Sequence, residues 1–500
     1  MIELRKIDNV FCRVLCDDSI AEELYHEFTF IIPNAKFNPL VKAKRWDGKI
    51  RLFNKKERKI YSGLEFKIRE FANKFGYDVI SDIKTKTDVT PQEIVEYCKS
   101  LNVTSKGETI NHINYQCAAI YYALKNKRKV IISPTGSGKS LIIYSLVRWI
   151  LENTEKKILI VVPNISLTLQ LFSDFIDYSS LNNFNVDDNC YIIEAGKNKD
   201  SKQKVYITTY QSIMKLEPDW FHQFQSVIVD ECHYAKTKSF LHILENAKNA
   251  EYRIGLSGSL DKSETNELVI QGLLGSIKRV ADTSDLMDRG ILAKLNIDFY
   301  ELMYDKTLKR GLNLPEYKDE IDFVISYNPR NEFIRDLSLS LNNNVLILFN
   351  YVKKHGDVLY DMISEQNKDK NIYYITGLTE KEEREKIRNL VENSSNNIII
   401  ASFGVYSTGV NIKNLHHIVL ASSTKSIVRL LQSIGRGLRI KEGKTECTFH
   451  DLCDNLVKNK KQNILLKHGI ERIQIYNEQK FEYKIQKFEL KEKRNPILIS

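Results

Sequence analysis

A glycine-rich segment in the first third of the chain has the composition of a phosphate-binding loop. It reads Ser133-Pro134-Thr135-Gly136-Ser137-Gly138-Lys139-Ser140, after an apolar run at 129–133 and before a second apolar stretch at 141–147. Glycines let backbone N–H groups turn toward phosphate oxygens, a lysine can reach the outer phosphates, and a hydroxyl can ligate Mg²⁺. The order of strand, loop and helix therefore predicts a nucleotide site with Mg²⁺ at Ser140, whose ligands are Thr135, Gly136, Ser137, Gly138, Lys139 and Ser140.

A pair of acidic residues follows another apolar run about 90 residues later, in Val227-Ile228-Val229-Asp230-Glu231-Cys232-His233. Asp230 can complete the Mg²⁺ shell, and Glu231 can orient and deprotonate an attacking water, which is the division of labour that phosphoryl transfer to water requires. Acidic residues after a strand also serve as caps or surface charges. The preceding phosphate loop favours the catalytic interpretation.

Two arginines stand three residues apart near the C-terminal end, in Leu431-Gln432-Ser433-Ile434-Gly435-Arg436-Gly437-Leu438-Arg439. This spacing predicts that Arg436 and Arg439 share one face of a helical turn. The planar, permanently charged guanidinium fits phosphate oxygens. Taken alone, the segment is better explained as a solvated basic helix.

The elements that would position these residues form two similar series. Short β-branched runs alternate with helical stretches, which is typical of buried parallel strands joined by crossover helices. The first series of strands is predicted at 129–133, 157–163, 204–209, 226–231 and 253–257. After a spacer near 282–304, the second is predicted at 344–350, 371–376, 397–402, 416–421 and 447–452. The sequence thus predicts an α/β protein with two tandem parallel sheets.

The remaining segments complete the predicted organisation. Residues 1–85 read as a small α+β domain and 86–110 as a connector. The two sheet domains occupy 111–285 and 286–455, and the lysine- and glutamate-rich residues 456–500 read as a helical extension. A chain of 500 residues has room for three or four domains of about 100–200 residues each.

Composition excludes several classes of protein. Hydrophobic residues make up 42% of the chain and charged residues 28%, as in globular proteins. Charges interrupt every apolar run well short of the roughly 20 residues that cross a bilayer, and no secretory signal is visible, so a cytoplasmic protein without membrane contact is expected. The eight cysteines are scattered and are predicted to be reduced thiols.

The net charge of +10 is concentrated near the N-terminus. Residues 36–60 contain ten lysines and arginines against Asp47 and Glu57, a balance of +8. With Trp46 and Phe53 among these cations, the segment predicts a nucleic-acid surface where a ring can stack on a base; its proposed contact residues are Lys44, Arg45, Trp46, Lys49 and Arg51. The alternatives are a solvated charged face with Trp46 in the core and, less favoured, a nuclease-like acid pattern around Asp47.

These motifs, taken in order, resemble those of superfamily 2 helicases. Residues 133–140 fit motif I, 163–170 motif Ia, 208–211 motif Ib, 230–233 motif II in the DECH spelling, 257–259 motif III, 402–411 motif V, and 432–439 motif VI. Phe37-Asn38-Pro39, the stretch 46–52 and the stretch 466–474 also resemble the UvsW-type recombination helicases of T-even-type phages. The resemblance covers nearly the whole chain.

The resemblance implies ATP bound between two RecA-like domains. Gln116 would read the adenine, Arg439 would contact the γ-phosphate with Arg436 beside it, and the residues coupling hydrolysis to domain closure would be Ser257, Ser259 and Gln432. One DNA strand's phosphates would be held by Asn164, Thr209, Gln211, Ser402 and Thr408.

The expected function is therefore an ATP-dependent DNA helicase or translocase. It would act as a monomer and without sequence preference on forks, Holliday junctions and R-loops, in recombination, repair and replication restart, in a phage-infected cell. Three alternatives remain open from sequence: an RNA helicase, an annealing or clamp protein that uses ATP only as a switch, and the motor part of a restriction-type enzyme.

Overall fold

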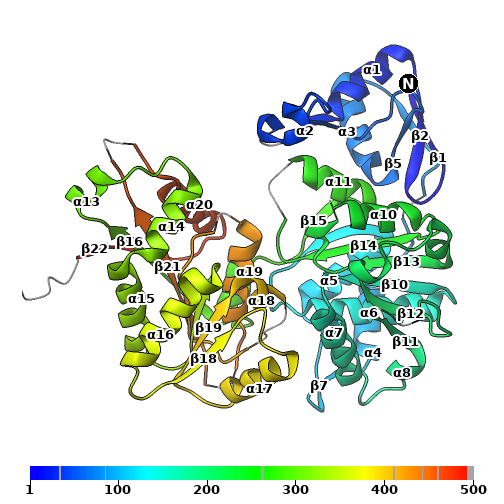
Figure 1. Ribbon diagram of the computed structural model, residues 1–500. Coiled ribbons are helices and arrows are strands. Elements are labelled where there is room, and N and C mark those ends of the chain that lie inside the picture. Colours follow the sequence, from blue (N-terminus) through cyan, green and yellow to red (C-terminus); the bar gives the residue numbers. More distant parts are fainter. Residues whose placement is uncertain are drawn as a thin grey trace, which may run out of the picture. The chain divides into compact units, whose positions relative to one another are not determined.

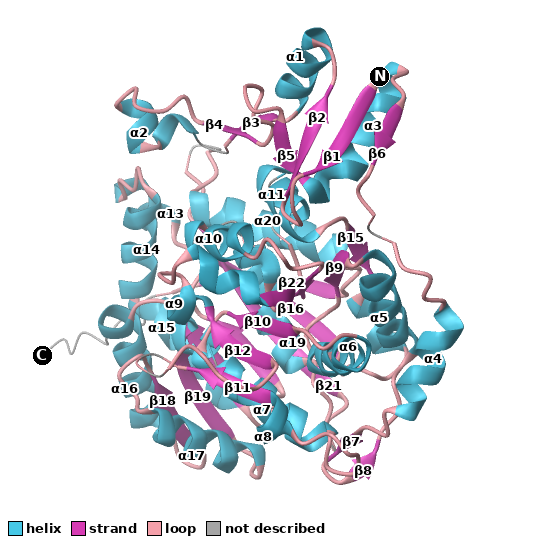
Figure 2. Cartoon of the chain, turned by 90° about the vertical axis from the view of Figure 1, so that its right-hand side faces the viewer, coloured by secondary structure: helices cyan, strands magenta, loops and turns pink. Residues whose placement is uncertain are grey.

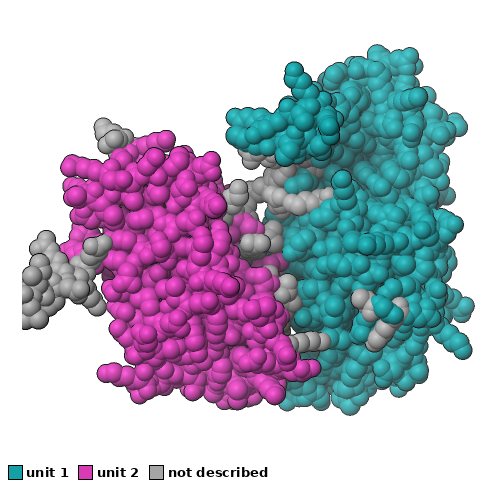
Figure 3. Space-filling view, in the orientation of Figure 1, with its two compact units in different colours: residues 1–133, 138–281 teal, residues 134–137, 282–500 magenta. Residues whose placement is uncertain are grey.

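The computed structural model describes residues 1–32, 35–84, 86–194, 196, 198–235, 237–260, 264–408, 412–424, 426–441, 443–458 and 461–491. The chain divides into two compact units (Figure 3). Residues 1–133 and 138–281 form the first unit, and residues 134–137 and 282–500 form the second.

The first unit begins with a small α+β domain. Its four-stranded sheet has the order β5-β2-β1-β6 and carries two helices (Figure 2). Ile2 and Leu4 on β1 are buried while their neighbours are not, the period-2 pattern of a strand with one face on a core. The elements are β1 (Ile2–Lys6), β2 (Phe11–Leu15), α1 (Asp18–Glu27), β5 (Lys59–Tyr61), α3 (Glu65–Phe75) and β6 (Val79–Ser81), with the ribbon β3 (Thr29–Ile31) and β4 (Lys49–Arg51) and the short α2 (Pro39–Lys42) beside them.

The connector contains a well-capped helix, α4 (Pro91–Ser100). Thr90 and Glu93 form a reciprocal capping box, in which the Thr90 hydroxyl accepts from the Glu93 N–H and the Glu93 carboxylate accepts from the Thr90 N–H. A two-stranded ribbon, β7 (Thr104–Ser105) and β8 (Glu108–Thr109), then leads to α5 (Asn114–Asn126).

A seven-stranded, wholly parallel sheet forms the centre of the first unit, in the order β11-β12-β10-β13-β14-β9-β15. Its inner strands are mostly apolar because helices cover both faces, with α5, α6 and α7 on one side and α10 and α11 on the other (Figure 1). The strands are β9 (Arg128–Ile132), β10 (Lys157–Val162), β11 (Cys190–Ile193), β12 (Val205–Thr209), β13 (Phe224–Val229), β14 (Tyr252–Ser257) and β15 (Ile277–Arg279), and the helices include α6 (Lys139–Asn153), α7 (Ile165–Tyr178), α10 (Lys238–Asn246) and α11 (Glu264–Leu274).

The N-terminal domain shares its core with this sheet. Leu64 and Phe71 belong to the same buried cluster as Leu273 and Leu274 of α11. Gly63 lies so close to α11 that a Cβ there would collide with the carbonyl oxygens of Gln271 and Gly272. The N-terminal domain is therefore packed tightly on the first sheet domain.

The second unit is built on another seven-stranded parallel sheet, in the order β18-β19-β17-β20-β21-β16-β22. The strands are β16 (Lys294–Met303), β17 (Val345–Phe349), β18 (Asn371–Ile375), β19 (Asn397–Ser402), β20 (His417–Leu420), β21 (Glu446–Asn455) and β22 (Tyr483–Glu489). The helices are α12 (Thr283–Asp288), α13 (Lys306–Gly311), α14 (Tyr317–Ser326), α15 (Asn328–Ser340), α16 (Asp357–Gln366), α17 (Lys381–Glu392), α18 (Phe403–Thr408), α19 (Ile427–Gly437) and α20 (Ile464–Glu478).

The prediction of two tandem parallel sheets with a small α+β domain before them is confirmed. Two segments differ from expectation. The spacer 282–304 contains β16, a ten-residue strand between β21 and β22. The C-terminal extension has the expected helix α20 but also β22, which pairs with β16 and so extends the sheet. Among the described residues, no helix is long and apolar enough to span a membrane.

Candidate functional site

The loop that follows β9 has the local conformation of a phosphate-binding nest. Gly136 and Gly138 have φ of 85° and 79°, a region that glycine enters without strain. Gly138 is the N-cap of α6, so the helix begins at Lys139. The Ser133 N–H donates to the carbonyl of Ser257 on β14 at 3.0 Å, which anchors the start of the loop to the sheet.

Lys139 and Glu231 come together although 91 residues separate them in the chain. Lys139 Nζ donates to the Ser133 carbonyl at 3.4 Å and lies 4.0 Å from Glu231 Oε1. The Ser140 hydroxyl is 2.8 Å from that of Tyr178. The sheet order explains this meeting, because β9 and β13 are separated only by β14 and all three are parallel.

The acidic pair stands at the carboxyl end of β13. The Asp230 N–H donates to the Val161 carbonyl at 3.0 Å, and the Glu231 N–H donates to Asp230 Oδ1 at 2.9 Å. Burial and the charge of Glu231 raise the pKa of Asp230 to about 6. Burial alone would also raise the pKa of Glu231, but the Lys139 ammonium and hydrogen bonds from its neighbours lower it below its usual range.

Ser257 and His233 hold the Glu231 carboxylate in place. The Ser257 hydroxyl donates to the Ser259 carbonyl at 2.7 Å and lies 3.3 Å from Glu231 Oε2. His233 Nδ1 lies 3.1 Å from the Ser257 hydroxyl and 3.2 Å from Glu231 Oε2. The acidic motif and the Ser-Gly-Ser turn are thus linked by direct contacts. Sequence reasoning gave His233 no role, although its place in the DECH motif was the available signal.

Gln116 lies against the phosphate-binding loop. It is 5% exposed, and its Oε1 accepts from the Ile113 N–H at 2.9 Å. Its Nε2 faces Gly138, where a Cβ would lie 2.5 Å away. The structure therefore brings together Gln116, Gly138, Lys139 and Glu231, which the sequence predicted from separate motifs.

Three predicted nucleic-acid contacts follow neighbouring strands of the same sheet. Asn164 caps α7, its Oδ1 accepting from the Leu167 N–H at 3.0 Å. Thr209 ends β12, with its hydroxyl 3.0 Å from that of Ser212. Gln211 Nε2 donates to the carbonyl of Pro163 at 3.4 Å. These residues line the carboxyl edge formed by β10 and β12.

The basic segment of the N-terminal domain is largely open to solvent. Trp46 is only partly buried and donates from Nε1 to the Lys49 carbonyl at 3.1 Å, so it is not a core residue. Arg51 donates from Nε to the Tyr25 hydroxyl at 2.6 Å and pairs with Asp47. The exposed predicted contacts are Lys44, Arg45, Lys49 and Arg51.

Phe53 does not offer a ring to a base. It is 1% exposed in the core of the N-terminal domain, so the expectation that it could stack is wrong. The reason is geometric: Leu52 and Phe53 follow the β3–β4 ribbon and turn inward, whereas the lysines on either side stay outside.

In the second unit, α19 carries Gln432 and Arg436 and ends at Gly437. Arg439 therefore lies two residues beyond the helix rather than on the same helical face. Lys444, 2% exposed, fixes this turn by donating to the carbonyls of Gly437 at 2.5 Å and Arg439 at 3.0 Å. Burial lowers the pKa of Lys444 to about 8. No motif or local pattern predicted a role for this residue.

The remaining predicted contacts lie after β19. Ser402 is the last residue of β19 and is 7% exposed, and Thr408 is the last residue of α18. Residues 409–411, the end of the predicted motif V, lie outside the described residues.

Two RecA-like parallel sheets, a phosphate loop against an acidic pair and an arginine-bearing turn after α19 define the class of superfamily 2 helicases. Three family descriptions match: "DNA helicase UvsW, N-terminal" over residues 1–82, "Type III restriction enzyme, res subunit" over 104–262, and "Helicase conserved C-terminal domain" over 329–441. The ATP-dependent DNA helicase uvsW of Enterobacteria phage T4 is 36% identical over 490 residues, which cover 94% of this chain and 96% of that protein. The chain belongs to the UvsW helicase family.

Two further comparisons agree. The crystal structure of T4 UvsW matches 98% of this chain and 100% of that one, with 33% identity and a TM-score of 0.52. The DNA 3'-5' translocase XPB2 of Sulfurisphaera tokodaii is 24% identical over 418 residues, 77% of this chain and 89% of that protein. The protein is accordingly an enzyme, an ATP-dependent helicase that binds nucleic acid, as the motifs predicted.

Proposed function

We propose that the protein uses ATP hydrolysis to unwind or branch-migrate branched DNA, including forks, Holliday junctions and R-loops, in recombination, repair and replication restart. The observation that carries the catalytic part is the 4.0 Å approach of Lys139 Nζ to Glu231 Oε1, with Asp230 adjacent. The branched substrate is supported by the match of residues 1–82 to the UvsW N-terminal domain.

The loop and the acidic pair suit a nucleotide with Mg²⁺. Bound ATP would supply the γ-phosphoryl group that water attacks. Backbone N–H groups of residues 135–140 and the Lys139 ammonium would hold its outer phosphates. The Ser140 hydroxyl and the Asp230 carboxylate would hold Mg²⁺, because this cation prefers oxygen donors. The Gln116 carboxamide would recognise the adenine.

Glu231 would orient the attacking water and take its proton. Its pKa stays low, so the carboxylate is ionised and ready to accept a hydrogen bond. His233 and Ser257 fix the orientation of this carboxylate. Ser257, Ser259 and Gln432 would couple ATP hydrolysis to closure of the two domains.

The second sheet domain would complete the site only when the motor closes. Arg439, with Arg436 beside it, would stabilise the negative charge of the transition state, a contribution worth about 10³–10⁵ in rate. Phosphate contacts on both sheets, at Asn164, Thr209, Gln211, Ser402 and Thr408, would then move relative to each other in each cycle. This alternation would drive translocation along one strand.

The domains would divide the work as the sequence predicted. The N-terminal domain, residues 1–85, would bind the branched substrate through Lys44, Arg45, Trp46, Lys49 and Arg51. Residues 86–110 would connect this domain to the two motor domains at 111–285 and 286–455. Residues 456–500 would support the second sheet. Binding to phosphates would tolerate any base sequence and weaken steeply with salt. We infer a monomer that works in the cytoplasm of the infected host.

The test is a panel of labelled forks, four-way junctions and RNA–DNA hybrids, each incubated with and without ATP. Lys139→Ala, Glu231→Gln and Arg439→Ala should abolish unwinding, whereas the exposed controls Glu217→Gln and Arg310→Ala should unwind like the wild type. Full activity in Lys139→Ala and Glu231→Gln would rule out the proposed chemistry.

The same panel separates the alternatives. ATPase stimulation by RNA but not by branched DNA would identify an RNA helicase. Strand annealing that needs ATP but not its hydrolysis would identify a switched clamp. Incision of a plasmid with Mg²⁺ would identify a nuclease in the basic domain.

A further inference from the structure

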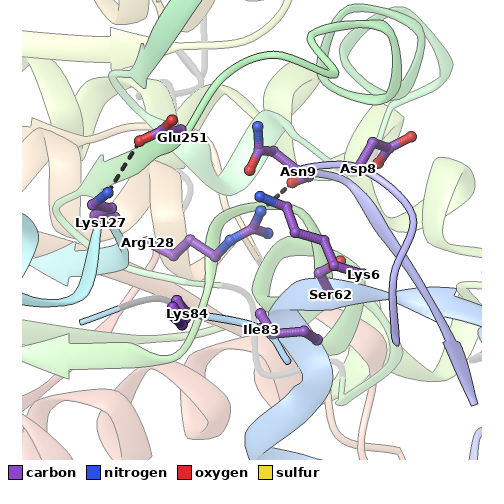
Figure 4. Close-up of a pocket in the computed structure, with 9 residues that line it drawn as sticks. All are labelled: Lys6, Asp8, Asn9, Ser62, Ile83, Lys84, Lys127, Arg128 and Glu251. Carbon is purple, nitrogen blue, oxygen red and sulfur yellow. Dashed lines mark hydrogen bonds and ion pairs between the residues drawn. The ribbon is translucent and has the colours of Figure 1, made fainter. Parts of the chain in front are cut away.

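A small cavity lies at the joint between the N-terminal domain and the first sheet, inside the first unit (Figure 4). Its volume is about 180 Å³. Four of its lining residues are cations from three different segments: Lys6 at the end of β1, Lys84 shortly after β6, and Lys127 and Arg128 where α5 gives way to β9. None of them belongs to the helicase motifs.

Arg128 is a buried cation with an unused donor. It is 7% exposed, its Nη2 donates to the Asn9 carbonyl, and its Nη1 has no hydrogen-bond partner among the described residues. Arg128 also forms no ion pair with a described residue. Burial lowers its pKa to about 10 despite the nearby charge of Asp8. A buried charge left this way costs several kcal/mol unless an anion compensates it.

Two other buried arginines of the chain have the carboxylate partner that Arg128 lacks among the described residues. Arg330 and Arg472, each 1% exposed, are paired with the carboxylates of Asp454 and Asp451 at 2.7 Å. Carboxylate pairing is therefore how this protein compensates a guanidinium in the second unit. No carboxylate among the described residues forms an ion pair with Arg128.

The neighbour of Arg128 in the sheet adds to the positive potential. Arg253 is opposite Arg128 in the β14–β9 register and is 0% exposed. It donates to the carbonyls of Leu244, Ala247 and Leu273, and no carboxylate among the described residues pairs with it. Burial and the charge of Arg128 lower its pKa to about 9.

The two carboxylates that line the cavity are already engaged. Asp8 Oδ1 accepts from the N–H groups of Val10 at 2.6 Å and Phe11 at 2.8 Å. Glu251 pairs with Lys127 at 3.0 Å (Figure 4). Lys6 and Lys84 line the same cavity without an ion pair to any described residue, and Arg128 Nη1 has no hydrogen-bond partner among those residues.

We propose that this cavity binds a phosphate group through Lys6, Lys84 and Arg128. Its source is either the backbone of a nucleic acid or free phosphate, since both present the same tetrahedral anion. Arg128 begins β9, and the phosphate loop 133–140 follows β9, so the bound group would join β1, the segment after β6 and the strand that carries the loop. The site is separate from the proposed ATPase residues and goes beyond the proposed function.

The experiment uses the full chain with saturating ADP, so that the nucleotide loop is already occupied. The cavity variant is Lys6→Gln with Lys84→Gln, and its control is Lys74→Gln with Lys99→Gln, two exposed lysines of the same unit outside the cavity. Thermal unfolding is followed as inorganic phosphate replaces chloride at constant ionic strength. The midpoint should rise in the wild type and the control, and this rise should be lost in the cavity variant and in Arg128→Met.

Binding of fork DNA at several salt concentrations distinguishes the two sources. If a DNA phosphate occupies the cavity, the slope of log K against log salt should fall by about 0.9 in the cavity variant, because the contact with one phosphate is lost. If free phosphate occupies it, the slope stays unchanged while the thermal response is lost. The proposal is overturned if the cavity variant behaves like its control in both measurements. Neither measurement depends on ATP turnover.

Discussion

Replacing Arg472 by methionine should destabilise the second unit strongly. Arg472 on α20 is 1% exposed and Asp451 on β21 is 0% exposed. Arg472 Nη2 donates to Asp451 Oδ1 at 2.7 Å, and its Nε donates to Oδ2 at 2.8 Å. Burial alone would lower the pKa of Arg472, but Asp451 raises it. Removing one member of such a pair costs about 3–5 kcal/mol, because the remaining charge stays buried without compensation.

The neighbours of the pair refine this magnitude. The Tyr476 hydroxyl donates to Asp451 Oδ2 at 2.7 Å and remains in the variant, so we expect a loss near the lower limit, about 3 kcal/mol. Arg472 Nη1 also donates to the Ser423 hydroxyl at 3.0 Å, a bond that the variant loses. Combining Arg472→Met with Asp451→Leu removes both charges and should restore most of the lost stability.

Amide hydrogen exchange is the suitable assay, because a chain of two units does not unfold in one step and a local free energy is needed. The amides of β21 and α20 report the local opening. Lys354→Met is the control, since its ion pair with Asp322 is 63% exposed on the lysine side and its loss should not change protection measurably. Equal losses of protection in the single and double variants would refute the reasoning.

Three further predictions follow from other contacts. Gly63→Ala should strain the joint with α11 by about 1–3 kcal/mol and lower fork-stimulated ATPase activity, whereas Gly311→Ala, with open space around it, should do neither; thermal unfolding and ATPase assays check this. Burial and the charge of a neighbouring arginine lower the pKa of His355 to about 3. Between pH 6.5 and pH 3 the unfolded chain therefore binds a proton at His355 that the folded chain does not, and the stability of the fold decreases as the pH falls through this range. At pH 5 the titration of His355 should have lowered the free energy of unfolding by about 2 kcal/mol relative to neutral pH. The unfolding midpoint of His355→Gln should therefore fall less between pH 7 and pH 5 than that of the wild type. Lys444→Met should free the turn that holds Arg439 and lower kcat of the DNA-stimulated ATPase about 10–100-fold with KM for ATP unchanged; unchanged kcat would show that the turn needs no such anchor.

The inner strands of both sheets could be predicted from sequence because they are buried on both faces. A strand such as β10 is an uninterrupted apolar run, and no exposed position breaks the pattern. β16 was not predicted because it lacks an uninterrupted apolar run: Asn296 and Asp298 alternate with Leu295, Ile297 and Phe299. Alternation at a period of two also indicates a strand, so this pattern could have predicted β16.

The candidate site could be predicted only in part. Motif residues such as Lys139 and Glu231 carry their chemistry in their type and spacing, but their proximity depends on the strand order, which no local pattern contains. Lys444 acts through contacts with the carbonyls of Gly437 and Arg439, so its own sequence context is uninformative, whereas His233 could have been noticed from its place in the DECH motif. Phe53 shows the converse: a local density of lysines indicates a charged surface but not which side chains turn inward.

The phosphate loop and the contact with the N-terminal domain lie at opposite edges of the first sheet. The phosphate loop and the acidic pair lie at the carboxyl ends of β9 and β13, where parallel sheets present their ligand sites. The N-terminal domain instead reaches the amino end of β9, where Arg128 donates to Asn9, and the exposed cations Lys6 and Lys84 gather there. The five residues of β9 therefore run directly from the contact with the N-terminal domain to the start of the phosphate loop.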